Sequence, residues 1–511
     1  MFCEVKAIIE YFFLAKIYLT KILFIMYEGA NFWPAFTCLP LKFLLIHDIG
    51  GFPNPQTRDT MGLFTRGITF PKAFTTTGLT PIDIPLPRQV TLPLRQYMGE
   101  AAEPSVKVGD TVKVGQIIAT APGPHALPLH ATISGKISAL DETLTYTGIP
   151  MPAITITGDG KDTWKRLPKP TSDIDALTTD ELMAQVDAAG LITTGMFPVP
   201  LARDLMPLEQ PKTHLTLDGR TVVQRIDTLM ITACDPEPAL GVNRFLATTN
   251  TESLPIGIAA LTKLTGADEI RFIVDKNTAP PAQLTALVAA DETERTTITA
   301  INGKHYPAAH PAVLIKALVH REIPLPYGHP RDVGVALYDL ATVIALGDAL
   351  TTGRPPVAQQ ITVGGGAIKT GGIVTARLGT SLGDIIEAVG GFSRDPAKII
   401  MGGPLTGMAH YDLSVPLSKE ATGLFALTEE EITLTQGYRQ CINCGRCVAV
   451  CPVNLVPGML SLYCAKDRFD RAEQQGVLTC IECGCCDYVC PSRRPLVHLF
   501  RYAKHQLMEE G

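Results

Sequence analysis

Two cysteine runs near the end of the chain constrain its fold more than any other feature. The first reads C-I-N-C-G-R-C-V-A-V-C-P from Cys441, and the second reads C-I-E-C-G-C-C-D-Y-V-C-P from Cys480. Each follows C-x2-C-x2-C-x3-C-P, the spacing with which bacterial chains hold [4Fe–4S] clusters. Two intervening residues let a tight loop wrap three thiolates around one face of a cluster, whereas the fourth cysteine faces away. We therefore expect two loops that complete each other.

The fourth cysteine of such a run ligates the cluster of the other run when two clusters are present. We assign cluster 1 to Cys441, Cys444, Cys447 and Cys490, and cluster 2 to Cys451, Cys480, Cys483 and Cys486. Gly445 and Gly484 lie in the loops, where the backbone must pass close to the inorganic core. We interpret each of the additional thiols, Cys464 and Cys485, as a buried thiol or one without a function.

Other uses of the cysteines fit the pattern less well. Zinc sites would favour two CxxC halves per metal rather than two complete runs that each end in proline. Ten of the 13 cysteines follow residue 440, a clustering that indicates a cofactor rather than disulfides and favours a reducing, cytoplasmic compartment.

Length and composition indicate a multidomain globular protein. The 511 residues predict three or four domains, and a hydrophobic content of 46% with 18% charged residues is ordinary for globular proteins. The formal net charge of −6 argues against nucleic acid as a partner.

Residues 1–60 differ from the rest of the chain. They are rich in Phe, Ile, Leu and Tyr, but Glu10, Lys16 and Lys21 interrupt the apolar stretch before it reaches the length of a spanning helix. We interpret them as a translated upstream leader, with Met61 as the start, or as a membrane-surface segment.

Residues 61–160 predict a β domain. Residues 106–119 and 129–140 alternate apolar and polar side chains, with turns at Gly109-Asp110 and Ser134-Gly135. The pattern is similar to the lipoyl-type barrel-sandwich hybrid, although we interpret Lys136 as an ordinary strand lysine. His125 and His130 are expected at the surface.

Residues 173–350 predict an α/β domain and residues 358–427 a β-grasp domain. The run Thr228–Cys234 has the composition of a buried parallel strand, and Asp235 and Glu237 follow at its carboxyl end, where open α/β sheets bind ligands. Gly364, Gly365 and Gly366 are expected to be hairpin glycines rather than a phosphate loop, because no helix with Lys-Ser/Thr follows them. In the ferredoxin-like domain, residues 430–505, we expect one helix over 457–474 that packs Met459, Leu460, Leu462 and Tyr463 against the clusters.

With these modules in this order, the chain resembles the C subunit of the Rnf (Rsx) ion-translocating oxidoreductases over residues 65–505. The resemblance rests on residues 106–119 and 130–135, C-D-P-E-P from Cys234, R-D-V-G-V-A-L from Arg331, G-G-P-L-T-G from Gly402, and the double cysteine run. It implies a peripheral protein on the cytoplasmic side of the inner membrane, with other Rnf-type subunits, NAD(H) and ferredoxin as partners. It also implies a domain like the flavin-binding 51 kDa subunit of NADH dehydrogenase, followed by an SLBB β-grasp domain.

The chain departs from this family where the flavin would bind. The family loop resembles G-x-G-G-A-G-F-P-T, but residues 191–199 read L-I-T-T-G-M-F-P-V and keep only Gly195 of its glycines. The acidic A-E-C-E-P block corresponds to residues 234–238, so both carboxylates carry over. The candidate FMN site thus comprises Gly195, Asp235 and Glu237, and no catalytic residue is assigned.

Two hypotheses about function follow. The chain is either an FMN-containing subunit that exchanges electrons with a nicotinamide and relays them through its clusters, or a docking and electron-relay subunit whose flavin site has lapsed. The retained carboxylates favour the first hypothesis, and the loss of glycines favours the second. A soluble cobalamin-reductase-like flavoprotein is a third reading with related modules.

Overall fold

The computed structural model describes residues 66–70, 80–123, 125–168, 170–194, 198–206, 225–326, 328–432, 437 and 439–509, and the backbone of 213–215 and 221–223. Residues 1–60, interpreted above as a leader or a membrane-surface segment, lie outside these ranges. All of the described residues belong to one compact unit. Within the described ranges, no helix is both long and apolar enough to span a bilayer.

The first module, called the barrel module, consists of short antiparallel strands, as the alternating sequence predicts. One sheet has the strand order β3-β9-β8-β5 and another has the order β4-β6-β7. The bounds are β3 (Gln89–Pro93), β4 (Glu103–Pro104), β5 (Thr111–Val112), β6 (Ile117–Thr120), β7 (Leu129–His130), β8 (Gly135–Leu144) and β9 (Pro150–Gly158). Gly135 permits close pairing of β8 with β9, because a Cβ there would collide with the carbonyl oxygen of Thr157.

The two histidines of this module have different environments. His125 is exposed, as expected. The expectation of a surface position for His130 is wrong, because its side chain is only 3% exposed. Burial, together with the nearby charge of Lys419, lowers the pKa of His130 to about 3. The alternating pattern shows that a strand is present but not which neighbouring module covers its outer face.

The second module, called the α/β module, has a parallel sheet with the order β14-β13-β12-β16. The strands are β12 (Thr228–Thr232), β13 (Glu269–Asp275), β14 (Thr296–Ile301) and β16 (Val335–Asp339). Every residue of β12 is buried, which accounts for its uninterrupted apolar sequence. The strand predicted immediately before Asp235 is confirmed as β12.

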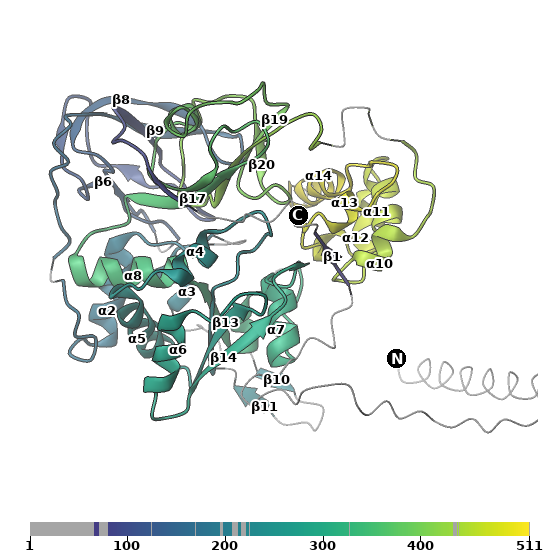
Figure 1. The fold of residues 1–511 in the computed structure, drawn as a ribbon, viewed down its shortest axis with the longest axis horizontal. Coiled ribbons are helices and arrows are strands. Elements are labelled where there is room, and N and C mark those ends of the chain that lie inside the picture. The colour runs from purple at the N-terminus through teal and green to yellow at the C-terminus, as the bar shows by residue number, and fades with distance from the viewer. Residues whose placement is uncertain are drawn as a thin grey trace, which may run out of the picture. The chain divides into compact units, whose positions relative to one another are not determined.

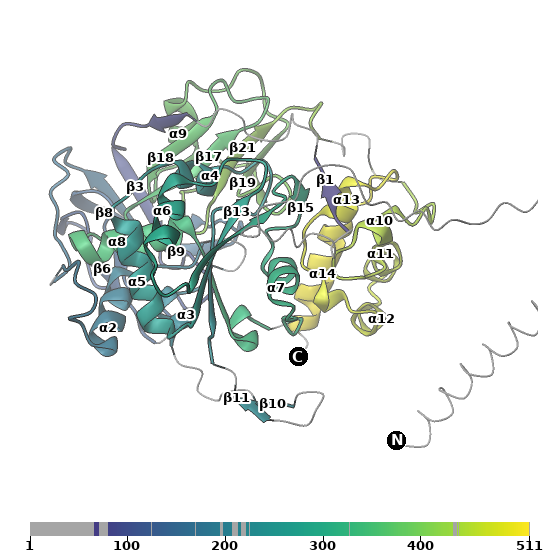
Figure 2. The same cartoon turned by 60° about the horizontal axis from the view of Figure 1, so that its bottom comes forward.

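Helices cover both faces of this sheet (Figure 2). Leu229 and Ile231 of β12 belong to a core with α2, α5 and α8, whereas Met230 belongs to the core under α7. The helices are α2 (Thr179–Ala189), α3 (Leu201–Leu205), α4 (Val242–Thr248), α5 (Ser253–Thr265), α6 (Ala282–Ala290), α7 (Pro311–Val319), the 3-10 turn η2 (Pro330–Val333) and α8 (Leu340–Thr352). Two short antiparallel pairs join the module: β10 (Thr213–Leu215) with β11 (Thr221–Val223), and β1 (Ile68–Thr69) with β15 (His305–Tyr306).

The third module, called the mixed-sheet module, wraps a six-stranded sheet around one helix. Its strand order is β2-β18-β17-β21-β19-β20. The elements are β2 (Pro81–Asp83), β17 (Ala358–Gly364), β18 (Gly372–Arg377), α9 (Leu382–Ala388), β19 (Lys398–Met401), β20 (Met408–His410) and β21 (Gly423–Leu427). The expected hairpin is confirmed, since β17 and β18 are antiparallel and Gly365 has a φ of 98° in their turn.

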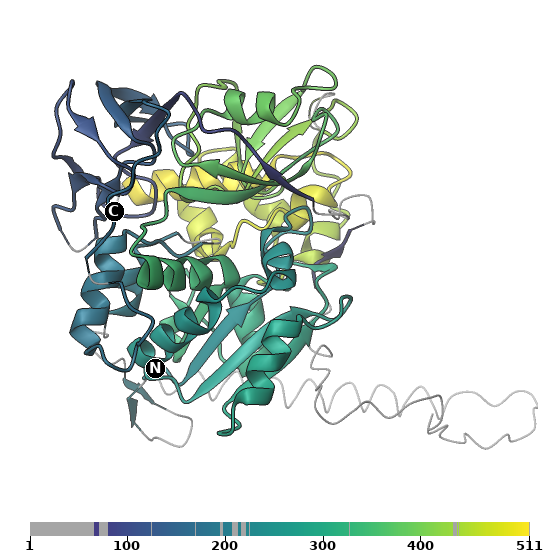
Figure 3. The ribbon, with the colours of Figure 1, turned by 60° about the vertical axis from the view of Figure 1, so that its left-hand side comes forward.

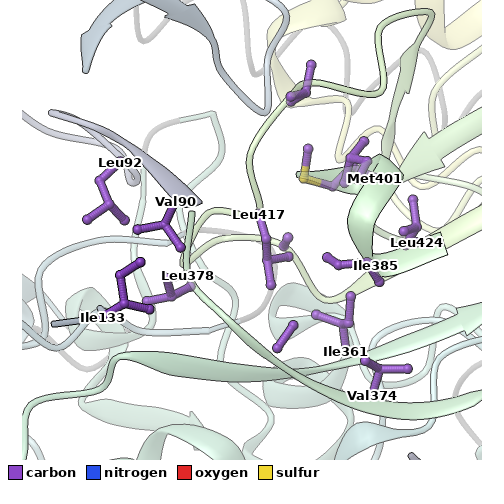
Figure 4. Packing of buried hydrophobic residues seen from close by; sticks show 14 of the residues in the cluster. Val90, Leu92, Ile133, Ile361, Val374, Leu378, Ile385, Met401, Leu417 and Leu424 are labelled. Atoms are coloured by element: carbon purple, nitrogen blue, oxygen red, sulfur yellow. The ribbon is translucent and has the colours of Figure 1, made fainter. Parts of the chain in front are cut away.

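The barrel and mixed-sheet modules share one core. Figure 3 shows their strands beside each other, and Figure 4 shows Val90, Leu92 and Ile133 of the barrel module near Leu378 and Leu417 of the mixed-sheet module. β2, which precedes the barrel strands in sequence, pairs with β18. The two modules are therefore continuous in packing although each has a separate sequence signature.

The fourth module, called the cysteine module, is a bundle of short helices at the C-terminal end (Figure 1). They are α10 (Arg446–Val450), α11 (Pro457–Cys464), α12 (Phe469–Gln474), the 3-10 turn η4 (Val477–Thr479), α13 (Cys485–Tyr488) and α14 (Leu496–Glu509). The expectation of one helix over 457–474 is wrong. Asp467 has a left-handed φ of 51°, and a residue in that conformation does not continue a right-handed helix.

Candidate metal centre

The two cysteine runs have the same backbone conformation. In the first run Asn443 and Gly445 have φ values of 52° and 72°, and in the second run Glu482 and Gly484 have φ values of 54° and 76°. Gly445 and Gly484 lie immediately before α10 and α13, respectively. The loops therefore turn in the same way, each with a glycine where a left-handed residue is required.

The first three cysteines of the first run lie around the start of α11. A Cβ on Gly458 would lie 3.6 Å from the Sγ atoms of both Cys441 and Cys447. Burial raises the pKa of the Cys447 thiol, and Cys441 and Cys444 are nearby groups that raise it further. The missing side chain of Gly458 thus leaves room between thiols that a cluster would occupy.

Cys451, the fourth cysteine of the first run, lies with the second run. Burial raises the pKa of the Cys486 thiol, and the charges that raise it further include those of Cys480, Cys483 and Cys451. Burial and the nearby charge of Cys483 likewise raise the pKa of the Cys451 thiol. These four residues are the set assigned above to cluster 2.

Cys490, the fourth cysteine of the second run, lies beside the first. It lines a cavity of about 440 Å³ together with Arg446, Ala449 and Val450 of α10 and with Tyr488, Val489 and Pro491. The structure therefore places each fourth cysteine near the other run. Within the described residues, no three His, Cys, Asp or Glu side chains are arranged to hold a single metal ion.

The donor set suits [4Fe–4S] clusters. Backbone N–H groups donate to two of the thiol sulfurs, from Leu455 to Cys451 at 3.3 Å and from Glu482 to Cys480 at 3.4 Å. Hydrogen bonds of this kind to sulfur are among the factors that set cluster potentials. Cys464 is buried, as expected. Cys485 is also buried and its S–H donates to the carbonyl oxygen of Tyr306 at 3.9 Å.

The loop of the second run packs against the other modules. The Tyr306 hydroxyl donates to the carbonyl oxygen of Cys483 at 2.6 Å. Ile481, Cys483 and Cys485 share an apolar cluster with Tyr306, and Leu405 of the mixed-sheet module packs against it. Tyr306 is not predicted as a site residue from the sequence, because no local pattern marks it and its contact with Cys483 joins segments far apart in the chain.

Asp235, proposed from sequence as part of a flavin site, is engaged within the protein. Its carboxylate accepts the N–H of Asn243 at 2.9 Å, at the start of α4, and pairs with Arg244 at 2.9 Å. Burial raises the pKa of Asp235, and Arg244 opposes that shift. Its side chain is 4% exposed.

Glu237, the second carboxylate of that block, connects two modules. It accepts the backbone N–H groups of Leu405 at 2.8 Å and Thr406 at 2.9 Å, and the Thr406 hydroxyl also donates to it. Arg501 of α14 donates to the carbonyl oxygen of Thr406 at 3.0 Å and pairs with Glu482 at 2.8 Å. Glu237 thus supports the turn that lies next to the loop of the second cysteine run.

The described part of the candidate flavin loop does not form a phosphate cradle. Gly195 itself lies outside the described residues. Just before it, the N–H of Thr193 donates to Val199 at 2.8 Å and the N–H of Thr194 donates to the Thr342 hydroxyl at 3.0 Å. The Thr194 hydroxyl donates to Asp339. A phosphate needs free backbone N–H groups, and both of these are used inside the protein.

Four family models match the chain in order. They are the RnfC barrel sandwich hybrid domain over residues 63–161, the Nuo51 FMN-binding domain over 212–348, the SLBB domain over 360–409 and the 4Fe-4S dicluster domain over 433–492. The second match begins after the candidate flavin loop. The dicluster match agrees with the expectation of two [4Fe–4S] clusters.

Curated relatives match most of the chain. The C subunit of a proton-translocating ferredoxin:NAD(+) oxidoreductase complex from Clostridium ljungdahlii is 32% identical over 85% of this chain and 92% of its own. The C subunit of a Na(+)-translocating complex of the same type from Acetobacterium woodii is 30% identical over 88% of this chain and 98% of its own. The C subunit of an ion-translocating oxidoreductase complex from Rhodobacter capsulatus is 34% identical over 83% of this chain and 79% of its own.

Proposed function

The chain belongs to the family of C subunits of Rnf-type ion-translocating oxidoreductase complexes, and from this premise we propose that it is the iron–sulfur electron-transfer subunit of such a complex. As a peripheral subunit it would exchange electrons between NAD(H) or ferredoxin and the membrane subunits that translocate the ion. We place it on the cytoplasmic side of the membrane, in keeping with its cysteine content and the substrates named for its relatives.

One observation carries this proposal: the two cysteine runs fold crosswise into a single module whose inner loop packs against the two preceding modules. We propose the ligand sets Cys441, Cys444, Cys447 and Cys490 for cluster 1 and Cys451, Cys480, Cys483 and Cys486 for cluster 2. When bound, such clusters supply reversible one-electron transfer.

The chain's own residues would give the clusters different surroundings. Among the proposed ligands of cluster 2, Cys451, Cys483 and Cys486 are buried. Those of cluster 1 are all partly or fully exposed. Tyr306 and Leu405 cover the loop of cluster 2 and limit access of water to it. Cluster 2 is thus the inner site and cluster 1 the outer one.

A relay without a flavin is the reading that the loop geometry favours. The N–H groups of Thr193 and Thr194 donate to acceptors within the protein. The carboxylates of Asp235 and Glu237 both accept hydrogen bonds from backbone N–H groups of the protein. The match to an FMN-binding family model favours the alternative, in which the subunit holds FMN and exchanges electrons with NAD(H) itself. In that case Gly195, Asp235 and Glu237 remain the candidate flavin site.

Cofactor analysis of the anaerobically purified, full-length chain tests these proposals. About eight irons per chain without flavin would support the relay. One FMN that is reduced by NADH would support the dehydrogenase reading. A colourless protein that carries zinc would contradict both readings.

We also keep the predicted domain boundaries as a proposal: a leader or surface segment over 1–60, then 61–160, 173–350, 358–427 and 430–505. Limited proteolysis followed by mass spectrometry would test them, with cleavage expected between these ranges.

A further inference from the structure

The last helix of the cysteine module, α14, presents two cations to the loop of the second cysteine run. Arg501 and Lys504 are three residues apart and therefore lie on one side of the helix. Lys504 Nζ donates to the carbonyl oxygen of Cys480 and to the carboxylate of Glu482, both at 2.7 Å. Arg501 Nε donates to the other oxygen of that carboxylate at 2.8 Å. Both cations thus hold Glu482, and Lys504 also holds the backbone of a proposed cluster-2 ligand.

The helix that follows the first run, α11, brings no charge to the clusters. It reads P-G-M-L-S-L-Y-C and contains no charged residue. The expectation that Met459 and Leu462 pack against the clusters is wrong, because both side chains are exposed, whereas Leu460 is buried. Of these two helices, α14 is the one that places charged groups beside a cysteine loop.

The group of three charges is partly buried. The side chain of Lys504 is 14% exposed, and those of Glu482 and Arg501 are each 28% exposed. Charges withdrawn from water interact more strongly, and salt screens them less, than charges at the surface. Two oxygen acceptors face the Lys504 ammonium group, which compensates for its loss of water. The positive charge of Lys504 is thus held in one place next to Cys480.

The first cysteine run has an uncharged residue at the position equivalent to Glu482. It reads C-I-N-C where the second run reads C-I-E-C, so Asn443 stands in place of Glu482. The two residues have nearly the same backbone conformation, with φ values of 52° and 54°. The loop therefore takes its shape without the carboxylate and its two cations. These charges distinguish the surroundings of the second run from those of the first.

We propose that Lys504 is a positioning residue that raises the midpoint potential of cluster 2. The inference rests on the proposed function, since it requires that cluster 2 exists. Reduction adds one electron, and hence one negative charge, to the cluster, and no bond is made or broken. A positive charge fixed beside the ligand loop stabilises the reduced state more than the oxidised state. Electron transfer from the outer cluster to the inner one is therefore more favourable with Lys504 than without it.

Other contacts of α14 remain in place when Lys504 is changed. At the start of the helix, the N–H of Leu496 donates to the Asp487 carboxylate at 2.7 Å. Arg501 donates to the carbonyl oxygen of Thr406 at 3.0 Å in addition to its contact with Glu482. A neutral residue at position 504 therefore removes one positive charge and leaves these contacts of the helix intact.

A redox titration of the full-length, iron-loaded chain, followed by EPR, tests the inference. At the wild-type midpoint potential, Lys504→Gln should lower the ratio of reduced to oxidised cluster 2 about tenfold, which corresponds to a fall in potential of about 59 mV. This is the size expected for one charge about 10 Å away at an effective dielectric constant of about 20. Lys504→Arg should restore most of the ratio, because it keeps the charge. The matched control, Lys107→Gln, makes the same change in net charge at an exposed lysine of the barrel module and should leave the ratio unchanged.

Glu482→Gln provides a second test with the opposite sign. It removes the negative charge next to Lys504, so the ratio of reduced to oxidised cluster 2 should rise. A loosened loop would instead move the potential in the same direction in Lys504→Gln and Glu482→Gln, and that result would overturn the inference.

Three further results would also overturn it: an unchanged potential of cluster 2 in Lys504→Gln, equal shifts of both clusters, or the same potential in Lys504→Gln and Lys504→Arg. If Lys504→Gln does not assemble cluster 2, Glu482→Gln decides, and a ratio that falls or stays constant contradicts the inference. A wild-type chain without iron would instead overturn the proposed function.

Discussion

The carboxylate of Glu237 accepts hydrogen bonds that connect the α/β module to the mixed-sheet module, and it is not exposed to a ligand. It is 2% exposed and accepts three hydrogen bonds from the turn at Leu405 and Thr406. Burial raises the pKa of Glu237, and the donors from Thr406 and Leu405 oppose that shift. A buried carboxylate is tolerated where several donors face it.

Replacement of Glu237 tests this role. Glu237→Ala leaves three partly buried donors without an acceptor, so we expect the free energy of unfolding to fall by about 2–5 kcal/mol. Glu237→Gln, which retains one acceptor oxygen, should lower the free energy of unfolding by less. Chemical denaturation of the iron-loaded protein measures both, with the exposed Glu142→Ala as the control. If the Glu237→Ala protein had wild-type stability but did not bind nucleotide, Glu237 would instead be a ligand-binding residue.

At the scale of elements, α10 and α13 are equivalent pieces that complete each other. Each follows a loop with a left-handed glycine, and each is followed by the fourth cysteine of its run near the opposite loop. A mutation in one run should therefore affect a cluster that the other run helps to hold.

Serine substitutions test this crosswise arrangement. We expect Cys444→Ser, in the first run, and Cys490→Ser, in the second, to perturb the same EPR signal, because both residues are assigned to cluster 1. Cys451→Ser should perturb the other signal. Cys464→Ser is the control, since this buried thiol is not assigned as a ligand. If Cys444→Ser and Cys451→Ser removed the same cluster, the crossed assignment would be wrong.

At the scale of the whole described unit, the cysteines proposed to hold cluster 2 lie where the cysteine module meets the two modules before it. Tyr306 of the α/β module, 4% exposed, reaches Cys483, and Leu405 of the mixed-sheet module packs beside Gly484. The surroundings of the proposed inner cluster are therefore set by contacts between modules.

We expect Tyr306→Phe to lower the midpoint potential of cluster 2. The dipole of the hydroxyl donor stabilises the more negative reduced state of the cluster. Its removal should therefore favour the oxidised state and lower the potential. Redox titration followed by EPR should show the shift for cluster 2 alone, with iron content unchanged. Tyr97→Phe is the matched control, because Tyr97 is a buried tyrosine of the barrel module whose hydroxyl donates a hydrogen bond to the carbonyl oxygen of Glu100. An equal shift in both clusters would show that the effect is not transmitted through the Cys483 contact.

Local patterns predicted many of the elements. The buried strand that begins at Thr228 and the hairpin at Gly365 occur as expected, because their signals are a run of apolar residues and turn residues. The continuous helix over 457–474 failed, since apolar periodicity does not register a single left-handed residue at Asp467. The surface position of His130 failed because burial between modules leaves no local sign.

The order of the cysteines along the chain already specifies eight thiols suited to two clusters, because ligand spacing within a loop is a local property of the backbone. Folding decides the rest. Burial of the cysteines assigned to cluster 2 against Tyr306 and Leu405, and the structural use of Glu237, arise from packing between segments far apart in sequence. Such packing depends on which surfaces meet in space, and no stretch of residues encodes it alone.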